Sequence, residues 1–337
     1  MSAEGRSWGL ILGLLALGLA GTIWLALGIG VGRAGFGDLG RITSQDLDPW
    51  TRAILLDVRL PRVLLAALVG AALSGAGVAF QATLRNPLSD PYILGVSGGA
   101  ALGAVAFTAM AGGSRVWSPL GRPAAAFAGA MLSVVVLFAL ARIRGRTETT
   151  ALLLVGVIIN AIDSALILFL VTAGDTSRFQ GALFYLVGSI GSPPWSVIAS
   201  IAGLTVAGLA GLTLLSHRLN LLSFGEETAG HLGVNVEAVL WTAVVSASLI
   251  TAASVAFVGL VGFVGLIVPH AVRAAFGPDH RLLVPASALA GGSFLVLADT
   301  LARVMFAPVE LPVGVITALL GGPFFLYLFM KRLREGG

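Results

Sequence analysis

Long apolar runs, separated by short polar segments, extend along almost the entire chain. Ten of these runs approach the roughly 20 residues that a helix needs to cross a bilayer. They lie near residues 8–32, 60–83, 93–111, 123–141, 151–173, 195–215, 238–256, 258–272, 282–303 and 312–330. Lipid cannot satisfy open backbone groups, so we expect the spans to be helices. The pattern predicts an all-α integral membrane protein with about ten transmembrane helices in a single domain, residues 1–337.

Two of the runs carry special features. The first, Trp8 to Val31, is too long for the core of a signal peptide, and we interpret it as a retained span. The eighth, Val258 to Val268, is short and ends at Pro269, so we expect a broken or tilted helix there.

Composition supports a lipid-solvated chain, since charged residues make up only 11% of it, against about 25% in soluble domains. The net charge of +4 comes from residues scattered through short loops, which favours anchoring at lipid headgroups over nucleic-acid binding. Placing the N-terminus inside puts eleven of the 20 basic residues on the cytoplasmic side, including Arg142, Arg144, Arg146 and Lys331. This bias predicts that both termini are cytoplasmic.

A nucleotide-binding P-loop requires a lysine followed by serine or threonine. The sole lysine of the sequence, Lys331, is followed by Arg332, and the sequence contains no cysteine. If this chain serves ATP-driven transport, we therefore expect the ATPase, with its ATP and magnesium, to be a separate polypeptide.

A polar island at residues 222–233 interrupts the apolar pattern and carries two adjacent acids, Glu226 and Glu227. Ser223 can cap a helix with Glu226 at the capping-box distance, and Gly230 and Gly233 can end it. An ordered, charged helix on a membrane protein predicts a docking face for another protein.

At the predicted outer side, the segment Arg59-Leu60-Pro61-Arg62 opens the second span. These arginines are either anchors at the membrane interface or a cationic patch for the carboxylates of an incoming protein. Asp299 and Arg303 lie four residues apart near the outer end of the ninth span, where they can pair on one helix face.

Within the fifth span, Gly156, Asn160, Asp163 and Ser164 recur at helical spacing and form one polar stripe. Such a stripe lines a pore or forms hydrogen bonds between helices. Thr149 and Thr150 lie at the inner end of this span, where threonine also serves as a helix cap.

The sequence offers little for catalysis. The four histidines are scattered, with no metal-ligand spacing on one helix, and we expect no metal site and no enzyme activity in this chain. The main alternative to ATP-driven transport is an ion-coupled secondary transporter that moves protons through Asp163 or Asp299.

Several motifs occur in the order typical of one family. They are Arg59-Leu60-Pro61-Arg62, the segment from Gln81 through Asn86-Pro87-Leu88-Ser89-Asp90-Pro91, Leu94 through Ala100, Gly225-Glu226-Glu227-Thr228-Ala229, Gly262 through His270, Ala298-Asp299 with Arg303, and Glu310 through Gly314. The chain resembles the permease subunits of bacterial ABC importers for vitamin B12, ferric siderophores and haem, from about residue 55 onward.

The resemblance implies a type II ABC importer permease with ten spans, forming a homodimer in the bacterial cytoplasmic membrane with two cytoplasmic ATPase subunits and an extracytoplasmic binding protein. It implies that the fifth span lines the translocation path and that no cofactor binds to this chain. By matching motifs, it assigns docking of the binding protein to Arg59, Arg62 and Arg303, the inner gates to Asn86, Leu88, Thr149 and Thr150, and coupling to the ATPase to Gly225, Glu226, Glu227, Thr228, Ala229 and His231. Gly230, His231 and Thr150 depart from the usual residues of the family.

Overall fold

The structure, a computed structural model, describes residues 3–30, 35–41, 47–92, 94–110, 121–143, 146–147, 149–173 and 185–335. Within these ranges helices dominate, and the exception is a two-stranded antiparallel hairpin that the sequence pattern does not predict. The elements are α1 (Ala3–Gly28), α2 (Phe36–Leu39), α3 (Pro49–Ala53), the π-helix η1 (Ile54–Arg59), α4 (Leu60–Thr83), α5 (Val96–Met110), α6 (Gly121–Ala141), β1 (Arg142–Ile143), β2 (Arg146–Thr147), α7 (Thr149–Ala173), α9 (Trp195–Leu222), α10 (Glu226–His231), α11 (Val236–Val258), α12 (Val264–Phe276), α13 (His280–Val304) and α14 (Val313–Glu335).

Each of the ten predicted spans overlaps one apolar helix, but the helices differ in length. In the described part of the chain, seven helical segments are long and apolar enough to cross a membrane, and they include α1, α4, α6, α7, α9, α11 and α13. The apolar parts of α5, α12 and α14 are shorter. The prediction of an all-α protein with several membrane spans is therefore confirmed.

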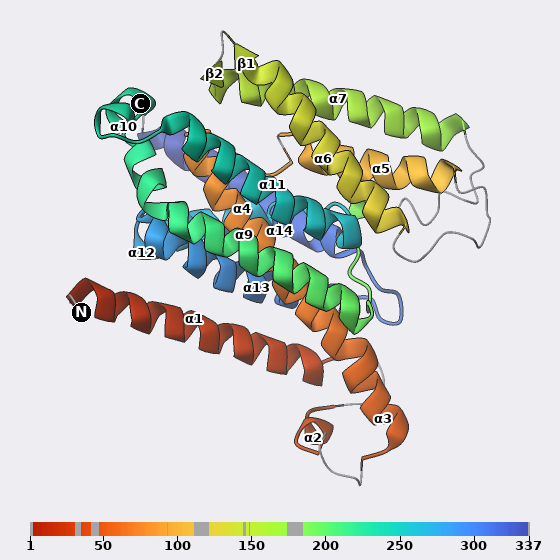
Figure 1. Ribbon diagram of the computed structural model, residues 1–337. Coiled ribbons are helices and arrows are strands. Elements are labelled where there is room, and N and C mark those ends of the chain that lie inside the picture. Colours follow the sequence, from red (N-terminus) through yellow and green to blue (C-terminus); the bar gives the residue numbers. More distant parts are fainter. Residues whose placement is uncertain are drawn as a thin grey trace.

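Helix α4 occupies the centre of the bundle. It packs against α13, α11, α9 and α12, and nearly all of its side chains are buried. Figure 1 shows α4 among these helices, with α1 on one side and the group α5, α6 and α7 on the other. Helices α5, α6 and α7 follow α4 directly in the chain. The later helices α9, α11, α12 and α13 then pack around α4.

Small residues allow the close packing of α4. A side-chain carbon at Gly70 would collide with the backbone of Gly291 on α13, and one at Gly77 would collide with the carbonyl group of Gly265 on α12. In lipid, where apolar side chains gain little by leaving the solvent, such close backbone approach increases the packing contacts that hold helices together.

The segment between α11 and α12 is not helical, which corrects the predicted eighth span at residues 258–272. Residues 259–263 are not helical, and residues 185–189, where a short helical stretch ends at Val187, pack against them. The amide of Leu260 donates to the carbonyl of Tyr185 at 3.0 Å, and that of Ser189 donates to the carbonyl of Val258 at 2.8 Å. Each of the two segments thus satisfies backbone groups of the other, as a site shielded from water requires.

Helix α12 continues through Pro269 to Phe276, so the helix is interrupted before Val264 and not at the proline. Proline has no amide hydrogen to donate to the carbonyl four residues earlier, here that of Gly265. The side-chain amide of Gln81, on α4, donates to that carbonyl at 3.1 Å. This contact replaces the lost helical bond, and it lies beside the close approach of Gly77 and Gly265.

The contact between α4 and α12 can be tested with Gly77→Ala. The added methyl group meets backbone rather than a movable side chain, so the helices must separate, and we expect a loss of about 1–3 kcal/mol of stability. Thermal unfolding in detergent measures it. Gly18→Ala, where nothing lies within 4 Å of the added carbon, is the matched control. Equal melting temperatures for the two variants would contradict the packing argument.

Candidate functional site

The polar island at residues 222–233 folds as a short helix, but it begins differently from the prediction. Helix α9 extends beyond the predicted end at residue 215 because Leu219 and Leu222 keep it packed on the core. Ser223 therefore ends α9, and its hydroxyl donates to the carbonyl of Asn220 at 2.6 Å. The prediction that Ser223 caps the following helix is wrong.

Helix α10 is preceded by Gly225, whose φ of 108° suits glycine and reverses the chain after α9. Glu226 and Glu227 occupy its first turn, where the positive end of the helix dipole favours acids. Ala229 is fully buried, so one side of the helix packs on the bundle. The helix ends at His231, shortly before Gly233, whose φ is 82°, as predicted, whereas Gly230 lies within the helix.

The side chain of Glu226 joins α10 to two segments that are distant in sequence. Its Oε1 atom accepts a hydrogen bond from Nη2 of Arg85 at 2.7 Å and another from the Thr149 hydroxyl at 2.9 Å. Arg85 lies in the loop after α4, and Thr149 begins α7. We call these three residues the Glu226 junction. The structure thus connects the predicted coupling helix with both of the segments predicted to carry the gates.

The other predicted gate residues lie beside the junction. Asn86 stabilises the loop itself, since its side-chain oxygen accepts a bond from the amide of Leu88 at 3.0 Å. Leu88 is partly buried, and Thr150 is exposed at the start of α7. Their role in gating stays a prediction.

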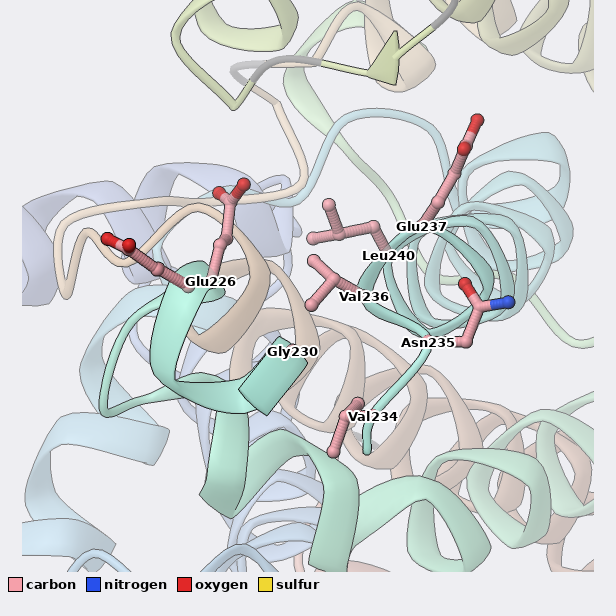
Figure 2. A pocket seen from close by; sticks show the side chains of 8 residues that line it. Glu226, Gly230, Val234, Asn235, Val236, Glu237 and Leu240 are labelled. Carbon is pink, nitrogen blue, oxygen red and sulfur yellow. The ribbon is translucent and has the colours of Figure 1, made fainter. Parts of the chain in front are cut away.

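A groove of about 650 Å³ lies between α10 and the start of α11. Figure 2 shows Glu226 on one wall and Glu237 on the other, with the apolar side chains of Val236 and Leu240 between them. Asn235 caps α11 at this point by accepting a bond from the amide of Ala238. Arg142 of β1 approaches Glu237 at 3.8 Å.

A cluster of charged side chains lies at the end of the bundle away from α10, where α4 begins and α13 ends. Arg62 forms a forked contact with the buried carboxylate of Asp299, with Nη2–Oδ1 at 3.0 Å and Nε–Oδ2 at 3.1 Å. Arg303 approaches the same carboxylate at 3.2 Å, which confirms the predicted pair on one helix face. A second acid, Glu310, binds the remaining nitrogen of Arg62 at 2.8 Å and is itself 53% exposed. We call this set the outer ionic cluster.

Arg59 and Arg303 are buried, contrary to the expectation of an outward-facing cationic patch. Arg59 donates to the carbonyl of Leu27 at 2.8 Å, and Arg303 donates to that of Ala26 at 3.3 Å. Both carbonyls belong to the last turn of α1, where the helix leaves its acceptors without partners. The two arginines thus cap α1, and only Arg62 of the three predicted docking residues is partly exposed at the surface. The docking role itself stays a prediction.

The polar stripe of α7 faces mostly towards α5. Gly156 and Asp163 are buried, and Asp163 and Asn160 approach Gly98 of α5. The side-chain amide of Asn160 donates to the carbonyl of Tyr92. Asn160 therefore forms a hydrogen bond between segments, one of the two roles expected for the stripe, whereas Ser164 lies on the exposed face of α7. Pathway lining by these four residues stays a prediction.

A second cavity, of about 520 Å³, lies beside the loop that carries Leu88. Its walls are mostly apolar, including Phe263 and Phe325, and they contain one carboxylate, Asp90. Burial raises the pKa of Asp90 to about 6, even though its carboxylate accepts a bond from the amide of Tyr92 at 3.0 Å. This group is consequently neutral in part of its population near neutral pH.

Three contributors were absent from the site predicted from the sequence. Arg85 and Gln81 belong to the motif around Asn86, but their partners lie on α10 and α12, more than a hundred residues away. Glu310 precedes the proline of another motif, and its partner Arg62 is equally remote. An acid and a base placed far apart in the sequence carry no signal of their pairing.

No group of three or more histidine, aspartate or glutamate side chains that could hold a metal ion occurs among the described residues. Of the histidines, His280 contacts Asn220 through its Nδ1 atom at 2.6 Å, and His270 meets the ring of Phe324 edge-on.

The fold and these polar clusters define a polytopic membrane permease, with a small ordered helix at one end and a buried ionic cluster at the other. The chain belongs to the FecCD transport family, whose profile matches residues 17–331. It is 44% identical over 281 residues to the cobalamin import system permease protein BtuC of Halobacterium salinarum, covering 83% of this chain and 74% of that protein. It is 38% identical to the hemin transport system permease protein HmuU of Yersinia pestis, with 84% of each chain covered.

A solved structure supports the same assignment. It is described as an inward-facing conformation of a metal-chelate type ABC transporter, and it matches with a TM-score of 0.83 at 31% identity, covering 96% of this chain and 99% of the other. The predicted family and the predicted permease fold are therefore confirmed.

The outer ionic cluster can be tested with Asp299→Ala. Removing a buried carboxylate leaves Arg62 and Arg303 close together without their shared partner, so we expect a loss of about 3–5 kcal/mol of stability. Glu310→Ala is the control, because its exposed contact with Arg62 contributes about 0–1 kcal/mol. Thermal or denaturant unfolding in detergent compares them, and equal losses would contradict the assignment of Asp299 as the centre of the cluster.

Proposed function

We propose that this chain is the membrane-spanning subunit of an ATP-driven importer that carries a metal-chelate cargo, namely a ferric siderophore, haem or cobalamin. The names of the cobalamin and hemin permeases among its relatives support this class of cargo. A further relative, 37% identical, is the iron(3+)-hydroxamate import system permease protein FhuG of Bacillus subtilis. The chain itself performs no bond chemistry in this proposal.

The observation that carries the mechanism is the Glu226 junction. An importer must convert movement of an ATPase into opening of a path through the membrane, and the sequence lacks a P-loop of its own. Helix α10 is ordered and charged, and it contacts the loop after α4 as well as the start of α7. It therefore suits the place where two separate ATPase subunits, which bind ATP and magnesium, drive the permease.

The outer ionic cluster is the proposed docking face for a substrate-binding protein. Because Arg59 and Arg303 cap α1, the exposed charges available to a partner centre on Arg62 and Glu310. Charges at the rim of an interface act mainly by steering the encounter and fixing its register. The buried members then hold Arg62 in place.

A second copy of the chain is the proposed partner within the membrane. Helix α7 is mostly exposed, since only 17% of its apolar window is buried, against 83% for the segment containing α4. A path along the axis of a homodimer would place the open face of α7, with Ser164, beside the cargo. We place the complex in the bacterial cytoplasmic membrane with both termini and α10 in the cytoplasm, as the basic residues favour.

The geometry disfavours the secondary transporter as an alternative. Asp299 is held between two arginines, at 3.0 Å from Arg62 and 3.2 Å from Arg303, so its release during a transport cycle would leave both buried cations without their shared partner. Asp163 is buried against α5 rather than facing an open path. Neither carboxylate is placed as a proton carrier.

Reconstituted vesicles test the proposed function. With ATPase subunits, binding protein and ATP, we expect uptake of the chelate, and without the ATPase subunits we expect none, because this chain has no means to use ATP. Radiolabelled or iron-loaded cargo measures uptake. Uptake that persists on a pH gradient alone, without ATPase subunits, would refute ATP-driven import.

If the binding protein docks at this face, the Glu310→Gln variant should associate with it faster than the unsubstituted chain does. This change removes a negative charge beside Arg62 while the buried Asp299 still holds the guanidinium. We expect the association rate constant to rise at low salt and the difference to shrink at high salt, since salt screens exposed charges. Surface plasmon resonance across a salt series measures it, and a rate that is unchanged at all salt concentrations would contradict docking at this face.

A further inference from the structure

The carboxylate of Glu226 is shared between two segments that the proposed function assigns to gating. We propose that Glu226 is a positioning residue that transmits movement of α10 to both segments through the bonds of its Oε1 atom. This inference rests on the proposed function, in which α10 receives its movement from the ATPase, and it names the contact through which that movement leaves α10.

The geometry makes the two segments depend on one atom. Oε1 of Glu226 accepts from Arg85 at 2.7 Å and from Thr149 at 2.9 Å, although these donors lie 141 and 77 residues away in the sequence. Arg85 directly precedes Asn86, and Thr149 is the first residue of α7. A displacement of α10 that keeps these bonds must carry the loop and the end of α7 with it.

The strength of these bonds suits positioning better than stabilisation of the fold. The side chains of Arg85 and Glu226 are 42% and 35% exposed. Exposed ion pairs contribute little to the free energy of unfolding, because water and salt screen them and two long side chains must be ordered. Loss of a contact of this kind should therefore change the positions of the two segments without unfolding the protein, whereas loss of the buried outer ionic cluster would destabilise the fold.

The backbone around the junction also favours a helix that moves as a unit. Gly225 and Gly233 flank α10 with positive φ angles, and nothing lies within 4 Å of a side-chain carbon built at either position. Short segments that absorb changes in φ and ψ are the usual hinges of such movements. Arg85 itself has a φ of 47°, which is uncommon outside glycine, so its loop is held in one particular conformation with the guanidinium at Glu226.

The test compares Glu226→Ala with Glu237→Gln in the complete complex of permease, ATPase and binding protein. Glu237 lies on the opposite wall of the same groove and contacts Arg142 rather than either gating segment. Uptake of cargo and hydrolysis of ATP are measured in the same vesicles. We expect uptake per ATP hydrolysed to fall by about five-fold or more in Glu226→Ala, the scale of a typical coupling between sites, and to be unchanged in Glu237→Gln.

Two further variants separate positioning from folding. Thr149→Val removes one donor without changing the shape of the side chain, and we expect a smaller loss of coupling than in Glu226→Ala. The melting temperatures of both variants should shift by less than about 4 °C, because the contacts are exposed. Arg85→Ala combined with Glu226→Ala should be no worse than Glu226→Ala alone, since both changes remove the same bond.

The labelling rate of an introduced cysteine measures the exposure of the proposed gate loop directly. The sequence has no cysteine, so Leu88→Cys gives one reactive site per copy of this chain, in the loop that Arg85 positions. We expect ATP to change the labelling rate of this cysteine and Glu226→Ala to abolish that change, while Glu237→Gln preserves it.

The outcomes distinguish the two proposals. If the unsubstituted complex shows no ATP-dependent uptake, the proposed function fails and this inference fails with it. If the unsubstituted complex transports and Glu226→Ala retains the same uptake per ATP and the same labelling change, the inference alone is overturned. Additive losses in the Arg85 and Glu226 double variant would likewise overturn it.

Discussion

Every backbone amide and carbonyl group of this protein that lies in the hydrocarbon layer must find its partner within the chain, because lipid offers none. Regular helices meet this requirement without help, and the irregular places show how strictly it applies. The break between α11 and α12 exchanges hydrogen bonds with the segment near residues 185–189. At Pro269, where the helix loses a donor, Gln81 supplies one from α4 to the carbonyl of Gly265. The end of α1 is completed in the same way by Arg59 and Arg303.

These substitutes for helical bonds also hold the bundle together. Gln81 of α4 donates a hydrogen bond to α12 next to the point where Gly77 meets Gly265. The hydrogen bond and the closest approach of the two helices therefore lie at the same place. Arg303 binds both the end of α1 and the carboxylate of Asp299, which in turn binds Arg62 of α4. Few polar side chains therefore fix the relative positions of α1, α4, α12 and α13, and the remaining contacts between these helices are largely apolar.

The polar groups at the two ends of the bundle differ in kind. The outer ionic cluster is mostly buried and connects helices that are fixed relative to one another. The Glu226 junction is half exposed and connects a short helix, flanked by glycines, with a loop and a helix end. Loss of a buried pair costs much stability and loss of an exposed pair costs little, so the outer ionic cluster stabilises the fold, whereas the Glu226 junction positions its segments without adding much stability.

The sequence by itself determined the class, the approximate positions of most of the apolar helices, and the presence of an ordered polar helix near residue 226. Hydropathy and spacing are local properties, and the requirements of lipid make them decisive. The ordered motifs also sufficed to identify the family, whose profile covers most of the chain.

Only the tertiary structure decided which polar groups meet. Arg59 looks like an exposed residue at the start of a span, but the end of α1 buries it. Pro269 looks like a helix end, but Gln81 allows the helix to continue. The link between Glu226, Arg85 and Thr149 has no trace in spacing or composition, because it depends on where three distant segments pack. The packing of whole helices decides which side chains meet, and no local sequence pattern encodes the distance between side chains that are remote in the sequence.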